Sequence, residues 1–187
     1  MKKIVLIFSA VVMMVGISAN LMAQDTHEAG DVFTYELDAM RIMDIEGTAP
    51  SLNLIKPDEA GEAVPDVSTD LSWINYTSII DNGATNKITA TLGGTGTMPT
   101  FTTLKVLAAA DASGGDGNVG TASSQLSLTE SAQDIITAIG SCWTGTGNTA
   151  GHKLTYTWGI DAGEYADAES ISSSNDITVL YTIIATP

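Results

Sequence analysis

The stretch DLSWINYTSIIDNGATNKITATL, residues 70–92, decides the fold class because it places two alternating segments around one turn signal. In residues 70–80 both alternate sets of side chains include apolar or aromatic members, which is typical of a central strand with one face in the core. The sequence DNG at residues 81–83 favours a tight turn, and residues 87–92 alternate apolar side chains with threonine. The pattern therefore predicts two strands that pair as a hairpin.

Two-residue alternation continues along most of the chain on both sides of this stretch. Glycine, serine, asparagine and proline separate the alternating segments, as turns separate strands. Eight or more short strands at close spacing are typical of antiparallel sheets that form a sandwich or a barrel. We therefore expect an all-β fold, an antiparallel β-sandwich, with further strands in residues 32–37, 40–45, 51–55, 102–110, 126–128, 153–160 and 176–184.

Residues 131–139 are the segment with the clearest helical spacing, because Ile135, Ile136 and Ile139 would share one side of a helix. The β-branched side chains of the same segment disfavour a helix. We therefore expect at most one short helix, and a strand is the alternative for this segment.

Residues 1–23 have the three parts of a secretory signal peptide. A lysine pair is followed by an apolar stretch, residues 4–17, and Ala23 is a small residue before the expected cleavage site. The stretch is shorter than the roughly 20 residues of a transmembrane helix, and an uncleaved anchor is the alternative. We expect export to the periplasm, the cell surface or the medium, and a single mature domain of residues 24–187 without a transmembrane segment.

The chain is strongly acidic, with 22 acidic and 7 basic residues among 187 and a formal charge of -15. Loss of the signal peptide would remove two lysines and leave a charge of -17. The hydrophobic content of 44% excludes an ordinary disordered acidic tail. Nucleic acids and anionic membranes bind clusters of lysine and arginine, so we expect neither as a partner.

Residues that could perform catalysis are few. Cys142 is the single cysteine, so it forms no internal disulfide, and a buried apolar role is favoured over a reactive thiol. His27 and His152 have no second ligand at metal spacing, and no serine lies in a Gly-x-Ser-x-Gly motif. The sequence GGTGT at residues 93–97 lacks the lysine of a phosphate-binding loop. We expect the protein not to be an enzyme.

The sequence DASGGDGNVG, residues 111–120, is the candidate metal site, and calcium is the one cofactor that the sequence raises. Asp111, Asp116 and Asn118 offer oxygen ligands, and the glycines between them permit a tight turn around a hard cation. The twelfth position is Ala122, so the bidentate carboxylate of an EF-hand is missing. A flexible, solvated loop is the alternative.

Tyr156 and Trp158 are the candidate glycan-stacking residues. They have the same parity in the predicted strand 153–160, so they would face the same side of a sheet. The alternative is that the two rings fill the core, as aromatic residues do in sandwiches. Exposed rings would make the protein a carbohydrate-binding module, with calcium as a possible aid.

Three phrases in the C-terminal half carry a resemblance to known proteins: TLKVLAAA (103–110), QLSLTESAQDIITAIGSCWTGTGNTAGHKLTYTW (125–158) and NDITVLYTI (175–183). The chain resembles a family of secreted bacterial surface proteins. It is more distantly similar to fimbrial subunits of the spore coat protein U type, in which an LTYT strand is followed by a late strand that ends the sandwich. The resemblance implies an immunoglobulin-like β-sandwich and, for the fimbrial relatives, assembly by donated strands.

We therefore expect a secreted structural or surface protein, such as a fimbria-like or filament subunit. Residues 32–37 and 177–184 alternate well enough to complete a neighbour's open sheet edge by strand addition. The expected partners are further copies of the chain or other surface proteins. A carbohydrate-binding module is the alternative, with glycans as partners.

Overall fold

The computed structural model describes residues 32–94, 96–112, 114–171 and 176–186. The chain divides into two compact units, Met1–Leu37 and Asp38–Pro187. The described part of the first unit, residues 32–37, is exposed and forms no helix or strand. The predicted signal peptide, residues 1–23, lies outside the described residues.

The described part of the second unit is built from strands, apart from one 3-10 turn, η1 (Glu164–Ala166). No helix in the described ranges is long and apolar enough to cross a membrane. The strands are β1 (Met40–Gly47), β2 (Val67–Ile79), β3 (Thr85–Gly93), β4 (Thr102–Asp111), β5 (Asp116–Gly117), β6 (Thr121–Ala122), β7 (Leu126–Ser127), β8 (Gln133–Ile139), β9 (Cys142–Trp143), β10 (His152–Ile160) and β11 (Thr178–Thr186).

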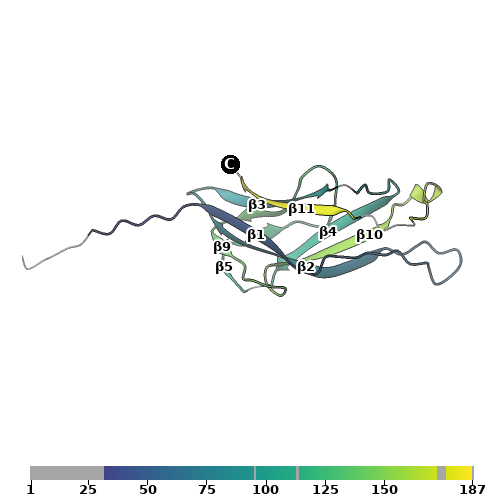
Figure 1. Ribbon diagram of the computed structural model, residues 1–187, viewed down its shortest axis with the longest axis horizontal. Helices are drawn as coiled ribbons and strands as arrows, with labels where there is room; N and C mark the ends of the chain where they lie inside the picture. The colour runs from purple at the N-terminus through teal and green to yellow at the C-terminus, as the bar shows by residue number, and fades with distance from the viewer. Residues whose placement is uncertain (1–31, 95, 113, 172–175, 187) are drawn as a thin grey trace, which may run out of the picture. The chain divides into compact units, whose positions relative to one another are not determined.

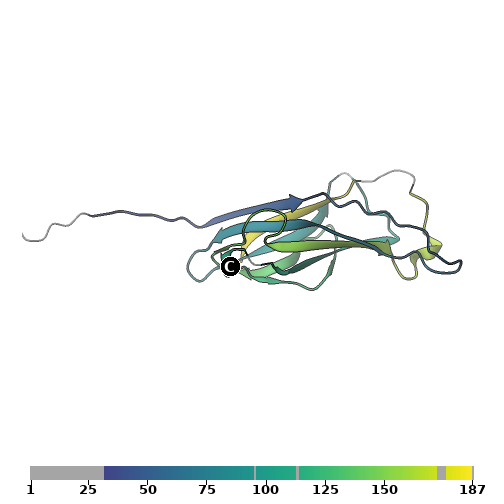
Figure 2. The same cartoon turned by 90° about the horizontal axis from the view of Figure 1, so that it is seen from below.

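These strands form two antiparallel sheets that pack against each other (Figures 1 and 2). In the larger sheet the hydrogen-bonded path is β5-β9-β2-β10-β4-β7; β9 and β10 both pair with one side of β2, and β1 pairs with the opposite side. The smaller sheet has the order β11-β3-β8-β6. The prediction of an all-β fold with packed antiparallel sheets is confirmed.

Strand β2 is an interior strand of the larger sheet, as its two apolar faces predict. It pairs with β1 on one side, and with β10 and β9 on the other. Ile74 and Tyr76 point into the core, where they meet Ile88 and Ala90 of β3 within one cluster of buried side chains.

The predicted hairpin of β2 and β3 is wrong, because the two strands belong to different sheets. The turn at residues 81–84, closed by a hydrogen bond from Ala84 N to Asp81 O (3.1 Å), carries the chain from one sheet to the other. Alternation of side chains is the same in a hairpin and in such a crossing, since each strand needs one apolar face in either arrangement. The turn signal alone therefore favoured the wrong connection.

The helix considered for residues 131–139 does not form. Gln133–Ile139 is strand β8, which pairs with β3, and Ile135, Ile136 and Ile139 are fully buried. Two consecutive isoleucines can both be buried here because the pairing with β3 is irregular between Asn86 and Thr89.

Two other predicted strands are absent from the described residues. Residues 32–37 and 51–55 have no strand assignment, although Leu52 packs against the core. Alternation in these segments is as good as in β1, so the difference is the lack of a neighbouring strand with which to pair. A strand needs main-chain partners as well as a pattern.

Candidate functional site

The open edges of the two sheets are the candidate functional site. A sheet edge exposes unpaired main-chain groups that can bind another strand, and proteins protect such edges by keeping them short or charged. Among the described strands, the edge strands β5, β6 and β7 have two residues each, whereas β1 has eight and β11 has nine. Only β1 and β11 are long enough to bind an extended segment.

Strand β1 is protected by charge. Its eight residues include Arg41, Asp44 and Glu46. Arg41 Nη1 donates a hydrogen bond to Asn86 Oδ1 (3.2 Å), and Asp44 Oδ1 accepts one from Ile45 N (2.8 Å). A strand added at this edge would have to accommodate these polar groups.

Strand β11 lacks protection by charge, because none of its nine residues is charged, although β1 at the edge of the other sheet lies close to it. It pairs with β3 through nine consecutive residue pairs without a register shift. Tyr181 faces the core, where its hydroxyl is 2.7 Å from the hydroxyl of Tyr156 in the other sheet. Leu180 and Ile184 lie on the opposite face and are 55% and 39% exposed.

The segment before β1, residues 32–37, is hereafter called the arm. Its apolar side chains are strongly exposed: Val32 is 96%, Phe33 82%, Tyr35 92% and Leu37 72% accessible. Phe33, Tyr35 and Leu37 occupy alternate positions, so they would share one face of an extended strand. A solvated segment with this pattern has apolar surface to bury and main-chain groups to pair.

The three predicted calcium ligands lie in or near strand ends. Asp111 ends β4 opposite His152 of β10. Asp116 Oδ1 accepts a hydrogen bond from Gly117 N (2.8 Å), and Asn118 Oδ1 accepts one from Gly120 N (3.1 Å). No group of three or more His, Cys, Asp or Glu residues within the described ranges could hold a metal ion. The side-chain oxygens of Asp116 and Asn118 thus hold their own loop in shape.

The predicted stacking residues, Tyr156 and Trp158, share the inner face of β10. Tyr156 is buried, with its ring among the core side chains. Trp158 is half-buried, and its indole nitrogen Nε1 is buried without a hydrogen-bond partner in the described structure. The structure therefore places Tyr156 where the core-packing alternative expects it, and the two rings form no open platform.

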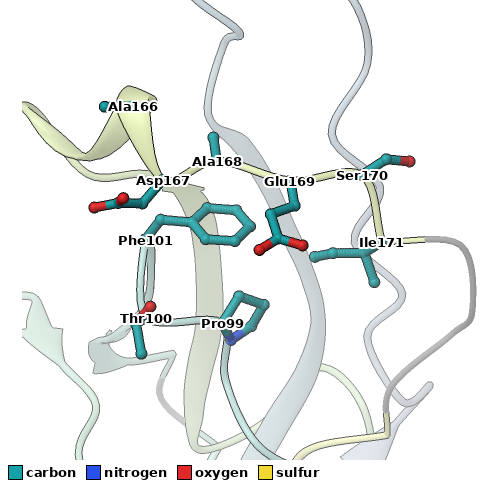
Figure 3. A pocket seen from close by; sticks show the side chains of 9 residues that line it. All are labelled: Pro99, Thr100, Phe101, Ala166, Asp167, Ala168, Glu169, Ser170 and Ile171. Atoms are coloured by element: carbon teal, nitrogen blue, oxygen red, sulfur yellow. The ribbon is translucent and has the colours of Figure 1, made fainter.

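An open depression of about 740 Å³ lies beside η1, and Asp167 and Glu169 are among the residues that line it (Figure 3). Glu169 directs its carboxylate between the Phe101 ring and Ile171, whereas Asp167 points away from them. Phe101 itself is buried. A single inward carboxylate in an open depression suits neither a metal ion nor acid–base chemistry, so the depression does not define a function.

One polar cluster escaped the sequence analysis. His152 is buried, with its Nε2 2.8 Å from the Tyr76 hydroxyl and its Nδ1 2.8 Å from Ala109 O. Because a carbonyl oxygen only accepts, Nδ1 donates to it. The one hydroxyl proton of Tyr76 is donated to Val119 O. The parity of His152 with Leu154 on β10 is the signal that places it on the core face.

This cluster is closed to solvent and changes how its members titrate. Burial raises the pKa of Tyr76 well above its usual value, and the nearby Cys142 and Asp111 add to the rise. Burial also raises the pKa of the Cys142 thiol to about 11, with a further contribution from Asp111. Cys142 is buried, as expected, and its high pKa leaves it an unreactive thiol at neutral pH.

Comparison of the chain with protein-family models, curated proteins and solved structures found no match. The features of the chain that bear on function are therefore its sheet edges, the arm and its net charge.

Removal of calcium should change the melting temperature by less than about 2 °C. The reason is that Asp116 and Asn118 already use their side-chain oxygens within the loop. Thermal melts with and without a chelator measure the effect. A fall in melting temperature of more than about 10 °C corresponds to several kcal/mol for a domain of this size, and it would instead reveal a calcium site in the acidic loops.

Proposed function

We propose that this chain is an exported structural or surface subunit that associates with further copies of itself by strand addition. The observation that carries the proposal is the arm, which exposes Phe33, Tyr35 and Leu37 on alternate positions directly before an antiparallel sandwich. In strand addition, main-chain hydrogen bonds supply affinity and alternate side chains fill pockets. The long edges of β1 and β11 are the available acceptors.

We further propose that the sandwich has an immunoglobulin-like topology. In immunoglobulin-like sandwiches the first, second, fifth and fourth strands lie side by side in one sheet. Here β1, β2, β10 and β4 lie side by side and β3 belongs to the opposite sheet, but β10 is the sixth of the longer strands, because β8 precedes it in the chain and also belongs to the opposite sheet. The arrangement therefore supports an immunoglobulin-like sandwich through the placement of β1, β2, β3 and β4, and in such a sandwich a structural role is favoured over catalysis.

The net charge sets the conditions for association. Export with removal of residues 1–23 would leave a charge of -17 on each copy. Like charge keeps copies apart at low ionic strength, and salt screens the repulsion over about 10 Å at 0.1 M. Association should therefore strengthen as salt concentration rises.

In the mature chain, Tyr35→Asp should weaken self-association at least tenfold, because it places a carboxylate among the apolar side chains that enter the acceptor. Thr34→Asp is the matched control, since it adds the same charge on the other face of the arm. Its effect should stay within about threefold. Light scattering across protein concentration and salt measures both variants. The arm lies outside the strands, so neither substitution should alter the circular dichroism spectrum.

A mature chain that remains monomeric at every concentration and salt tested would show the proposal to be wrong. Equal weakening by Tyr35→Asp and Thr34→Asp would show that charge alone acts, and that the alternating face of the arm has no role.

A further inference from the structure

We propose that the outer edge of β11 pairs with the same edge of a second copy, antiparallel and about a twofold axis at Thr182. The starting observation is that β11 is the single long edge among the described strands that lacks a charged residue. An exposed, long and apolar edge strand is a site of pairing with another chain. This association does not use the arm, so it goes beyond the proposed function.

The main-chain groups of β11 point in the required directions. Leu92 of β3 donates its N–H to Thr129 O (2.8 Å). Thr129 lies in the segment that leads into β8, so the Leu92 main chain points away from β11. Its partner across the ladder is Val179. In an antiparallel pair of strands, two opposite residues either exchange main-chain hydrogen bonds or both direct their N–H and C=O groups away from each other. The two kinds of pair alternate along the strands. Val179, Tyr181 and Ile183 thus direct their N–H and C=O groups to the open edge.

The main-chain N–H and C=O groups of Thr182 point the other way, toward β3. The carbonyl oxygen of Thr182 lies 3.5 Å from the hydroxyl of Thr89 on β3, which is a weak contact consistent with this alternation. Around a twofold axis at Thr182, Tyr181 of one copy would lie opposite Ile183 of the other, and both have main-chain groups at the edge. The two Thr182 residues would form a pair without mutual hydrogen bonds at the axis.

The exposed apolar side chains of β11 favour this register over the neighbouring ones. With the axis at Thr182, Leu180 of each copy lies opposite Ile184 of the other, on the outer face where both are exposed. A shift of the axis by one residue either way places Leu180 opposite Thr182 or Thr186. Cross-strand apolar pairs stabilise a sheet, and only the Thr182 axis covers both exposed side chains with each other.

The surrounding charge also permits this pairing. With a net charge of -15 on each chain, two copies repel each other. Strand β11 carries no carboxylate, and the residue of β3 opposite Ile184 is Lys87, which forms an ion pair with Asp134 (2.9 Å). One strand edge is a small interface, so the dimer should be weak and should strengthen with salt.

Disulfide trapping tests the axis directly. Directly opposite residues that share no hydrogen bonds have Cα atoms about 4.5 Å apart, which lies within the range for a disulfide. Thr182→Cys in the full mature chain, with oxidised glutathione, should therefore give a covalent dimer. Thr178→Cys is the matched control, because it lies on the same exposed face but about 27 Å from its copy across the axis. Cys142 is buried and common to both variants.

Thr182→Cys should cross-link at least tenfold faster than Thr178→Cys. Adding Leu180→Glu to Thr182→Cys should slow the reaction at least tenfold, since it buries a carboxylate against Ile184 of the other copy. Equal rates for Thr182→Cys and Thr178→Cys would indicate random collision and would overturn the proposal.

Deletion of residues 24–38 separates this proposal from the role of the arm. Undiminished cross-linking of Thr182→Cys without the arm supports edge pairing, whatever the light-scattering result for Tyr35→Asp. Cross-linking that occurs only after the deletion would show that the arm occupies β11 in the full chain. That result would overturn the twofold pairing and leave the proposed function standing.

Discussion

Gly151→Ala should destabilise the sandwich by about 3 kcal/mol and lower its melting temperature by roughly 10 °C. Gly151 has a φ of +69°, a conformation that side chains disfavour. A Cβ atom there would lie 2.3 Å from Ile74 O and 2.4 Å from Asn75 Oδ1. The clash involves the main chain of β2, so it can be relieved only by moving β10 away from its neighbour.

Gly83→Ala is the control for this prediction. Gly83 has a similar φ of +81°, but a Cβ atom there would meet nothing within 4 Å. Its substitution isolates the conformational cost, about 1–2 kcal/mol. Urea unfolding of both variants provides the comparison. Equal losses would show that close packing against β2 contributes nothing.

The strands were predictable where alternation coincided with a partner. Residues 102–110 and 153–160 alternate in the sequence, and they form β4 and β10, which pair with each other. The partners themselves were not predictable, because a period of two defines the faces of a strand but not its neighbour. Strands β2 and β3 are the clearest case: a turn signal joins them, yet each pairs with strands distant in sequence.

The candidate site was predictable in part for the same reason. The alternating arm and the last strand were recognised from the pattern of residues 32–37 and 177–184. That β11 is an edge strand depends on the order β11-β3-β8-β6, which arises from pairing between distant segments. The lack of charge in β11 was visible in the sequence, but its meaning required knowledge of that position.

The His152 cluster could not be predicted from the sequence for a second reason. A buried histidine needs partners for both ring nitrogens, and here they come from β2 and from the end of β4. These segments lie 76 and 43 residues away along the chain. Spacing rules for metal ligands consider only nearby residues, so they could not identify a hydrogen-bonded core histidine.

The sandwich should lose stability as the pH rises above about 9. Burial raises the pKa of Cys142 from 9.0 to about 11, and burial also raises the pKa of Tyr76, Tyr156 and Tyr181 above the usual 10.0. The unfolded chain therefore releases these protons at lower pH than the folded chain does. Their stabilising contribution is complete below pH 9 and declines through pH 11, by about 1.4 kcal/mol per pH unit for each proton concerned.

The paired tyrosines offer a variant that isolates their share of this loss. Tyr156→Phe combined with Tyr181→Phe removes both hydroxyls of the 2.7 Å contact and leaves no buried hydroxyl without its partner. Urea unfolding at pH 8, 9, 10 and 10.5 should show a shallower decline above pH 10 for the double variant than for the unmodified chain. The single change Tyr181→Phe should already cost about 1–3 kcal/mol at pH 8, because Tyr156 then keeps a buried hydroxyl alone. Identical slopes for the double variant and the unmodified chain would mean that these two hydroxyls titrate alike in the folded and unfolded states, and that the alkaline loss comes from Tyr76 and Cys142.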